Sequence, residues 1–156
     1  MTNKILPLRI GVGIVVLNSN NQVFVGKRKD NPNNTWQMPQ GGVGPGEILI
    51  NAMKRELQEE TGIKNIEIIK ERDDWMQYEL PKNLIGIIWK GKYRGQKQKW
   101  FIVRFHGKDN EIDLNTNHAE FIDWKWINIK QLPGVIVDFK KHIYKKIVDE
   151  LKEFTN

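Results

Sequence analysis

Along the chain, the spacing of hydrophobic positions changes between the pattern of a strand and the pattern of a helix. This change predicts a protein of α/β class. Short runs rich in β-branched and aromatic residues predict strands, and turn residues at 18–21 predict a hairpin between the first two. The predicted strands cover residues 9–17, 22–28, 66–71, 75–80, 85–89, 99–105 and 121–127. In the last of these strands the aromatic residues change phase, which indicates a bulge or burial on both faces.

Two helices are predicted among these strands. A glycine-rich loop at 41–46 leads into the first, which Gly62 ends, and the second runs from about Val137 to Phe154. The second helix has one apolar face, made of Phe139, Ile143, Ile147 and Leu151. No long linker or repeat separates the elements. We therefore expect residues 1–156 to form a single domain in which a mixed sheet is packed between helices.

The first helix carries three carboxylates, and the helical period places them on its inward side. At roughly 100° per residue, with Leu49 set at zero, Glu56 and Glu60 fall at about 340° and 20°, and Glu59 falls near 280°. The apolar residues of the helix occupy the same sector: Ala52, Met53 and Leu57. A solvated face would place these glutamates on the opposite side, where the sequence has Asn51, Lys54 and Gln58.

Three neighbouring anions that face the body of a protein repel one another and lose solvation. We therefore expect a positive charge to lie between them. Hard divalent cations such as Mg²⁺ bind carboxylate oxygens, usually together with substrate phosphates, so the first interpretation is a metal site. The alternative is an acidic helix end that nearby Lys and Arg side chains neutralise.

Composition limits the location and the partners. The 156 residues include no Cys, which excludes disulfides and thiolate metal sites and is compatible with a reducing cytosol. The longest apolar run, residues 10–17, is too short to span a bilayer, and the N-terminus lacks the apolar region of a signal peptide. We expect a cytoplasmic protein without a membrane partner. The formal net charge of +6 favours polyanionic partners, although this signal alone is weak.

The spacing of fixed residues around the first helix resembles a complete family signature. Gly41 is followed after five residues by Glu47 and, after seven more, by the run Arg55-Glu56-Leu57-Gln58-Glu59-Glu60-Thr61-Gly62-Ile63. This pattern resembles the signature of the Nudix hydrolases. The resemblance implies a Nudix fold, which is an α/β/α sandwich. It also implies hydrolysis of a nucleoside diphosphate linked to a further group, with a divalent metal.

The resemblance also implies roles for the residues of the signature. Glu56, Glu59 and Glu60 would hold the cations, most favourably Mg²⁺ with Mn²⁺ second, and the carbonyl of Gly41 would add a ligand. Ions that bridge the phosphates would lower the pKa of a water for attack on phosphorus. A salt bridge between Glu47 and Arg55 would lock the loop against the helix. The sequence leaves open which carboxylate takes the proton of the water, with Glu56 the first choice and Glu120 the second.

Four segments outside the signature resemble the bacterial RNA pyrophosphohydrolase branch of the family. They are 36–42 (WQMPQGG), 78–82 (YELPK), 95–101 (GQKQKWF) and 139–144 (FKKHIY). In that branch a glutamate just before an aromatic strand reaches the metals, which points to Glu120, although a loop glutamate with no such role is the commoner case. The same branch is described as cleaving dinucleoside polyphosphates. Two departures, Leu8 in place of an aromatic residue and a longer loop at 28–36, affect base contacts more than the chemistry.

Substrate residues follow from the same resemblance. Arg9, Arg28 and Lys140 would contact phosphates, and Tyr78 and Phe139 would sandwich the first base, since stacking tolerates any base. Both aromatic residues are also candidates for the core. Five cations lie within residues 90–99, a segment that forms either a solvated hairpin or a track for an RNA backbone.

Three functions remain open at this point. The first is removal of pyrophosphate from the 5′-triphosphate end of RNA, which leaves a 5′-monophosphate and promotes mRNA decay. The second is hydrolysis of dinucleoside polyphosphates such as diadenosine tetraphosphate by the same residues. The third is a non-catalytic nucleotide- or RNA-binding protein on the same scaffold, which the complete set of carboxylates disfavours. The family link makes a monomer the expected state.

Overall fold

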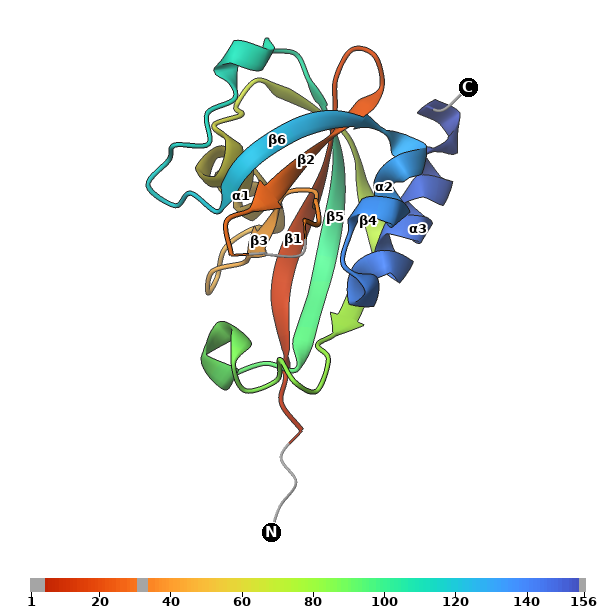
Figure 1. The fold of residues 1–156 in the computed structure, drawn as a ribbon. Helices are drawn as coiled ribbons and strands as arrows, with labels where there is room; N and C mark the ends of the chain where they lie inside the picture. The colour runs from red at the N-terminus through yellow and green to blue at the C-terminus, as the bar shows by residue number, and fades with distance from the viewer. Residues whose placement is uncertain (1–4, 31–33, 155–156) are drawn as a thin grey trace.

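A computed structural model describes residues 5–30 and 34–154. Within these residues the centre of the fold is a six-stranded mixed sheet with helices on both faces (Figure 1). The strands are β1 (Leu8–Leu17), β2 (Gln22–Arg28), β3 (Gln40–Gly42), β4 (Ile66–Glu79), β5 (Gly95–Phe105) and β6 (Phe121–Asn128). The α-helices are α1 (Leu49–Thr61), α2 (Leu132–Val135) and α3 (Lys141–Glu150). Short 3-10 helices are η1 (Ile88–Gly91), η2 (Asp109–Glu111), η3 (Ile129–Gln131), η4 (Asp138–Lys140) and η5 (Leu151–Phe154).

Strand β1 lies at the centre of a sheet with the order β4-β5-β1-β2-β6. It pairs in parallel with β5 along its whole length, from Leu8 opposite Gly95 to Leu17 opposite Arg104. Its other edge pairs with the short strand β3 over residues 11–13 and meets β2 at the end. Since β1 is buried on both faces from Gly11 to Leu17, it needs a continuous apolar run there rather than alternation, and the sequence supplies one.

Two hydrophobic cores lie on opposite faces of this sheet and confirm the expected α/β/α sandwich. One core packs the sheet against α2 and α3 through residues that include Trp100, Tyr144 and Ile147. The other packs the opposite face against α1 through residues that include Met53 and Leu57. Alternate residues of β1 and β5 supply both cores, because successive side chains of a strand point to opposite faces.

Helix α1 has the bounds and the orientation that its period predicts. Ala52, Met53, Leu57 and Glu60 are buried, whereas Asn51, Lys54 and Gln58 are exposed. Gly62 ends the helix in the left-handed conformation with φ 74°, where its N–H donates to the carbonyl of Gln58. The carboxylates of α1 therefore turn toward the sheet.

Two strand predictions are wrong between residues 66 and 94. The predicted strands 66–71 and 75–80 form one strand, β4, whose register shifts between Glu71 and Trp75 so that the intervening residues bulge. Residues 85–89 form no strand. The N–H of Leu80 already donates to the carbonyl of Arg94 and closes the hairpin of β4 and β5, so residues 81–93 form a loop of turns and η1.

Other boundaries also differ from the sequence expectation. The predicted C-terminal helix is divided into η4, α3 and η5, although Ile143, Ile147 and Leu151 are buried as its spacing requires. The phase change in β6 is a bulge, since Lys27 pairs with Asp123 and Arg28 with Phe121. The longer loop noted at 28–36 lies partly outside the described residues. In the described part of the chain, no helix is long and apolar enough to cross a membrane.

The first prediction concerns the link between α3 and the segment before β3. The buried hydroxyl of Tyr144 accepts a hydrogen bond of 2.7 Å from the N–H of Met38. Tyr144→Phe leaves that N–H buried without a partner, so we expect the free energy of unfolding to fall by about 1–3 kcal/mol. Chemical denaturation measures this loss. The matched control is Tyr93→Phe, which removes a hydroxyl from a half-buried ring, and equal stability of the two variants would contradict the assignment.

Candidate active site

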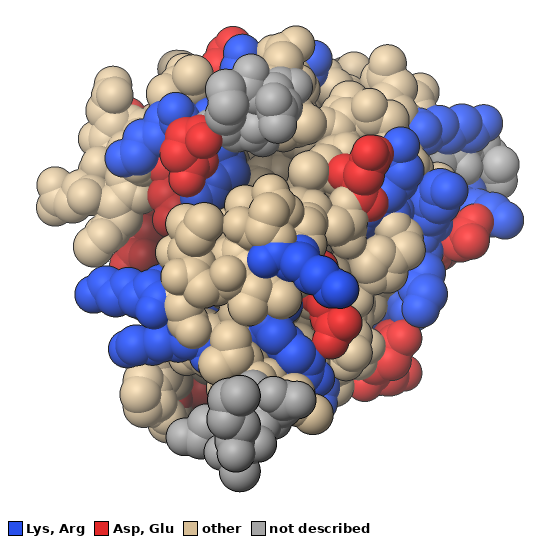
Figure 2. Space-filling model, turned by 60° about the horizontal axis from the view of Figure 1, so that its bottom comes forward, with Lys and Arg blue, Asp and Glu red and all other residues tan. Residues whose placement is uncertain are grey.

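A cavity of about 620 Å³ opens where the glycine loop, the loop before β6 and η4 meet. Eight of the residues predicted from the sequence line it: Arg9, Arg28, Gly41, Glu56, Tyr78, Glu120, Phe139 and Lys140. Basic and acidic side chains lie next to each other on the lower end of the molecule, rather than in separate patches (Figure 2). The cavity therefore combines carboxylates, cations and aromatic rings contributed by distant parts of the chain.

The guanidinium of Arg55 holds the glycine loop and the carboxylates of α1 together. Its Nε and Nη2 donate to the two oxygens of Glu47 at 2.8 and 2.9 Å, so the expected ion pair is present. Nη2 also donates to the carbonyl of Gly42 at 2.9 Å. Nη1 donates to Glu56 at 2.9 Å and to Glu59 at 3.2 Å. The hydrogen bonds from Arg55 lower the pKa of the Glu47 carboxyl to about 2, so this pair stays ionised through the neutral range.

Gly41 is required because the carboxyl group of Glu56 packs directly against it. A Cβ at position 41 would lie 2.0 Å from the Cδ of Glu56, and no side chain fits in that space. Gly41 lies in β3, paired with Val12, and not in a left-handed turn. Of the four glycines in the loop 41–46, only Gly46 has a positive φ, of 72°. Close approach, rather than backbone conformation, therefore explains Gly41.

Glu56 and Glu60 occupy environments that disfavour their charged forms. Burial raises the pKa of Glu56, against the hydrogen bond from Arg55, and Glu59 and Glu120 raise it further. Burial also raises the pKa of Glu60 well above its usual value, with Glu120 and Glu56 adding to the rise. One oxygen of Glu60 accepts from the N–H of Gln40 at 3.4 Å. Among the described residues, the other oxygen of Glu60 is buried without a hydrogen-bond partner.

These carboxylates fit a divalent cation in their chemistry. Hard cations prefer carboxylate oxygens. The buried oxygen of Glu60 that lacks a hydrogen-bond partner is a ligand atom that such a cation would coordinate. In the part of the chain that the structure describes, no three His, Cys, Asp or Glu side chains form a group that could hold a metal ion. Arg55 binds Glu56 and Glu59 in this arrangement. Neutralisation by nearby Lys and Arg, the alternative left open by the sequence, therefore applies to these two glutamates by direct contact, whereas Arg28 and Lys140 act on Glu60 only through space.

Arg28 faces the carboxylates from β2. Its guanidinium forms a fork with Asp30, at 2.8 and 3.0 Å, and its Nη1 lies 3.7 Å from Glu120. The hydrogen bond that Arg28 donates to Asp30 raises the pKa of Arg28, and Glu120 and Glu60 contribute to the rise. Asp30 had no signal in the sequence beyond its place in a polar loop. It fixes the plane of Arg28 at the edge of the cavity.

Lys140, Tyr78 and Phe139 form the opposite wall. The two aromatic rings lie 5.6 Å apart between centroids, and the Lys140 Nζ lies 5.0 Å from the Tyr78 ring and 5.8 Å from the Phe139 ring. Lys140 is only 9% exposed, and burial, followed by repulsion from Arg28, lowers its pKa to about 7. Tyr78 is buried and Phe139 half-buried, so both belong to the core and to the cavity wall.

Trp89 is a cavity residue that the sequence did not indicate. The guanidinium carbon of Arg9 lies 5.3 Å from the centre of the Trp89 ring, which in turn packs edge-on against Tyr93 at 6.0 Å. Trp89 and Lys90 both have left-handed backbones, with φ 54° and 57°. Such a conformation is unfavourable for large residues and is found where function or packing demands it. The contact orients Arg9 from the loop that replaces the predicted strand.

A row of buried amides lies beneath the cavity. Gln96 and Gln98 point to the α3 side of β5, where Gln96 accepts from the Tyr78 hydroxyl at 2.9 Å and Gln98 donates to Gln40 at 2.8 Å. Gln37 lines the cavity and is 6% exposed, and within the described residues its Nε2 donates to no partner. Buried amides that alternate with Lys97 and Lys99 were a detectable signal, since polar residues rarely occupy an inward strand face without a partner.

Comparison with known proteins agrees with this geometry. A family model described as NUDIX domain matches residues 7–149. An RNA pyrophosphohydrolase of Pelagibacter ubique is 63% identical over 155 residues, which cover 99% of this chain and 98% of that protein. A protein of the same name from Bartonella bacilliformis is 46% identical, over 96% of this chain and 94% of its own.

Solved structures share the fold at low identity. The Escherichia coli dihydroneopterin triphosphate pyrophosphohydrolase matches with a TM-score of 0.72 and 19% identity, over 94% of this chain and 99% of that chain. An Ap4A hydrolase of Caenorhabditis elegans in a binary complex matches with a TM-score of 0.63 and 19% identity, over 92% and 98% of the two chains. The family model, the full-length relatives and the shared fold all agree with the signature around α1, and the chain belongs to the NUDIX family.

Proposed function

We propose that this protein is a metal-dependent RNA pyrophosphohydrolase that removes pyrophosphate from the 5′-triphosphate end of RNA and leaves a 5′-monophosphate. The observation that carries the proposal is a single cavity that sets Glu56 and Glu120 opposite Arg9, Arg28 and Lys140. A site that hydrolyses a phosphoanhydride needs carboxylates that bind a divalent cation and basic side chains that bind the phosphates. The relatives named RNA pyrophosphohydrolase support RNA as the substrate.

The carboxylates supply the reaction centre in this proposal. Glu56, Glu59, Glu60 and Glu120, with the carbonyl of Gly41, would hold divalent cations, of which Mg²⁺ is the first candidate and Mn²⁺ the second. Bound there, the cations would neutralise phosphate charge and lower the pKa of a water. Glu56, whose pKa burial raises above its usual value, would take the proton from that water as it attacks phosphorus. Glu120 is the second candidate for this role.

The remaining residues would position the substrate. Arg9 and Arg28 would contact the phosphates through forked donors, and the Lys140 ammonium would contact them as a point charge. Tyr78 and Phe139, 5.6 Å apart and tilted by 47°, are too close to enclose a base as they stand. A base would therefore stack on one ring, or move Phe139 away from Tyr78, to form the sandwich. Arg55 and Glu47 would keep the loop and the helix in register.

A dinucleoside polyphosphate hydrolase is the second candidate function. It would use the same carboxylates and cations, so nothing in the centre of the cavity separates the two substrates. The shape and length of the substrate away from the phosphates must decide between them. We further propose that residues 1–156 act as one Nudix domain, as a monomer, in the cytoplasm.

Parallel assays of the two substrates test the proposed function. With Mg²⁺ present, we expect a higher kcat/KM for 5′-triphosphorylated RNA than for diadenosine tetraphosphate, with pyrophosphate or its hydrolysis product released from the RNA. Glu56→Gln should lower kcat for both substrates by about 10²–10⁴-fold, the usual contribution of a general base. Glu153→Gln, on the exposed end of the chain, is the matched control. Untouched RNA beside rapidly cleaved dinucleotide would refute the RNA assignment, and full activity in EDTA would refute the metal assignment.

Glu60 allows a test of the metal site that does not depend on activity. In EDTA, Glu60→Gln removes a buried anion with an unpartnered oxygen, so we expect the variant to gain about 1–3 kcal/mol in its free energy of unfolding. Addition of Mg²⁺ should raise the melting temperature of the wild type and leave that of the variant nearly unchanged. Thermal unfolding with and without Mg²⁺ measures both effects. An equal Mg²⁺-dependent rise in the two proteins would exclude Glu60 as a ligand.

Lys140 predicts a pH dependence of substrate binding. Its pKa of about 7 means that it is charged below that pH and neutral above it, with Arg28 repelling the charge and Glu60, Asp30 and Glu120 favouring it. We expect kcat/KM to lose a factor that approaches tenfold per pH unit above about pH 7. Lys140→Gln should have a lower kcat/KM than the wild type at pH 6 and show no decline at higher pH. Lys140→Arg stays charged throughout, so it should keep the kcat/KM of the wild type at pH 6 and also show no decline. An unchanged decline in both variants would show that another group titrates.

A further inference from the structure

A second groove, of about 830 Å³, lies on the α1 side of the sheet and has no role in the proposed reaction. Helix α1 covers the part of this side that contains Val12, Ile14 and Val16, which are completely buried; this is the upper half in the view of Figure 1. The lower half is uncovered, and Ile10 is 43% exposed there. We call the uncovered part the open sheet face and define it by Leu8, Ile10, Trp75, Lys97 and Lys99.

Strand register places these side chains next to one another. Trp75 of β4 lies opposite Lys99 of β5, and Lys99 lies opposite Val12 of β1, whose side chain is in the α1-side core. One step of two residues lower, Lys97 lies beside Ile10. Since residues two apart share a face of a strand, all of them point to the same side as α1.

The open sheet face presents an aromatic ring with two cations above it. Trp75 is 37% exposed, and the Nζ atoms of Lys97 and Lys99 lie 5.1 and 5.7 Å from the centre of its ring. Within residues 5–30 and 34–154, neither lysine forms an ion pair, although the Lys99 Nζ donates to the backbone carbonyl of Asp73. Three of the nearby acidic side chains are already paired, Glu47 with Arg55, Asp74 with Arg72 and Glu79 with Arg94, whereas Asp73 forms no ion pair within the described residues.

The second groove is continuous with the catalytic cavity. Arg9, Gly42 and Glu56 line both of them. Tyr93 lines the groove and Trp89 lines the cavity, and their rings are in edge-on contact, so these aromatic residues stand at the boundary. A polymer whose phosphate end occupies the cavity can therefore extend past Arg9 without leaving the surface.

We propose that the open sheet face binds the single-stranded part of an RNA substrate beyond its first nucleotides, an inference that rests on the proposed function. Exposed aromatic rings on a sheet stack bases without sequence preference, and lysines beside them attract the phosphate backbone. The face therefore carries the two kinds of contact that single-stranded RNA offers in alternation. A dinucleoside polyphosphate ends in its second nucleoside and has no further phosphates to meet Lys97 and Lys99, so the face favours RNA.

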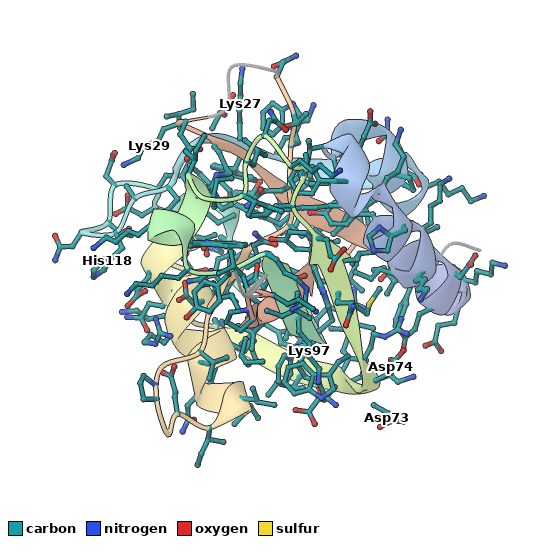
Figure 3. All side chains as sticks on the ribbon, turned by 90° about the horizontal axis from the view of Figure 1, so that it is seen from below. Lys27, Lys29, Asp73, Asp74, Lys97 and His118 are labelled. Carbon is teal, nitrogen blue, oxygen red and sulfur yellow. The ribbon has the colours of Figure 1, made fainter. Side chains whose placement is uncertain are left out.

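A competing route for the RNA lies on the other side of the molecule. Seen from below, Lys97 lies near Asp73 and Asp74 at one margin, and Lys27 and Lys29 lie at the opposite margin (Figure 3). Lys27 and Lys29 flank Arg28 in sequence and are basic without belonging to the open sheet face. They provide a charge-matched comparison that separates a specific path from a general attraction to RNA.

The test compares 5′-triphosphorylated RNAs of three and twelve nucleotides with the same 5′ sequence. Trp75→Ala should lower kcat/KM for the 12-mer about tenfold, as expected for one lost base stack, and leave the 3-mer unchanged. Trp75→Tyr, which keeps an aromatic ring, should restore most of the loss. Melting temperatures of both variants exclude misfolding as the cause. If the wild type cleaves neither RNA, the proposed function has failed; if it cleaves both and Trp75→Ala affects neither or both equally, only the open sheet face is refuted.

A binding measurement completes the test. For a 12-mer with a 5′-hydroxyl, Lys97→Gln with Lys99→Gln should reduce the slope of log affinity against log salt by about 1.4, because two phosphate contacts are lost. Lys27→Gln with Lys29→Gln should leave the slope unchanged, and the 12-mer should keep any higher kcat/KM that it has relative to the 3-mer. If the second pair abolishes that advantage while the first pair has no effect, the RNA follows the opposite margin and the proposal is overturned. Saturable binding of a protein partner to this face, with no change for RNA, would overturn it as well.

Discussion

One guanidinium sets the arrangement on which the rest of the site depends. Arg55 binds Glu47 in a fork and also contacts Glu56, Glu59 and the carbonyl of Gly42. Planar forked donors give such a contact direction as well as charge, which a lysine cannot reproduce. Because Arg55 is shared by three carboxylates, it only partly offsets their negative charge. Glu60 is the most deeply buried carboxylate of α1 and one of its oxygens has no hydrogen-bond partner among the described residues, which supports the proposed cation site.

The residues that line the cavity come from elements on both faces of the sheet, and the sheet brings them together. Glu56 comes from a helix on one face, and Phe139 and Lys140 come from a 3-10 turn on the other. Arg9 projects from the central strand between them and is held by Trp89 from a loop with left-handed residues. In the proposed reaction the chemistry depends on groups fixed by one sheet, while the substrate would meet a loop with left-handed residues.

Local periodicity predicted much of this structure and could not predict the rest. The helical period alone placed Glu56 and Glu60 inward, and the β-branched run predicted β1, because those features depend on neighbours in sequence. Residues 85–89 have high strand propensity, but hydrogen bonding between Leu80 and Arg94 leaves them no strand to join. Trp89 and Gln37 become cavity residues through contacts with distant parts of the chain, and Asp30 through an ion pair with Arg28 in an irregular loop, so no periodic signal marks them. The family resemblance supplied residues such as Lys140 that pattern alone would have left in a helix.

The hydrogen bond between Tyr144 and Met38 has a consequence for the order in which the parts of the cavity fold during synthesis. It joins a late helix to the segment that leads into β3, across 106 positions of sequence. During synthesis the chain emerges from its N-terminus, so the loop and carboxylates of α1 exist well before their partners. The cavity closes only when residues up to Tyr144 are free to fold back on the sheet. A nascent chain that still lacks them carries the signature around α1 without the cavity wall formed by η4, so the cavity is completed only after these late residues have been synthesised.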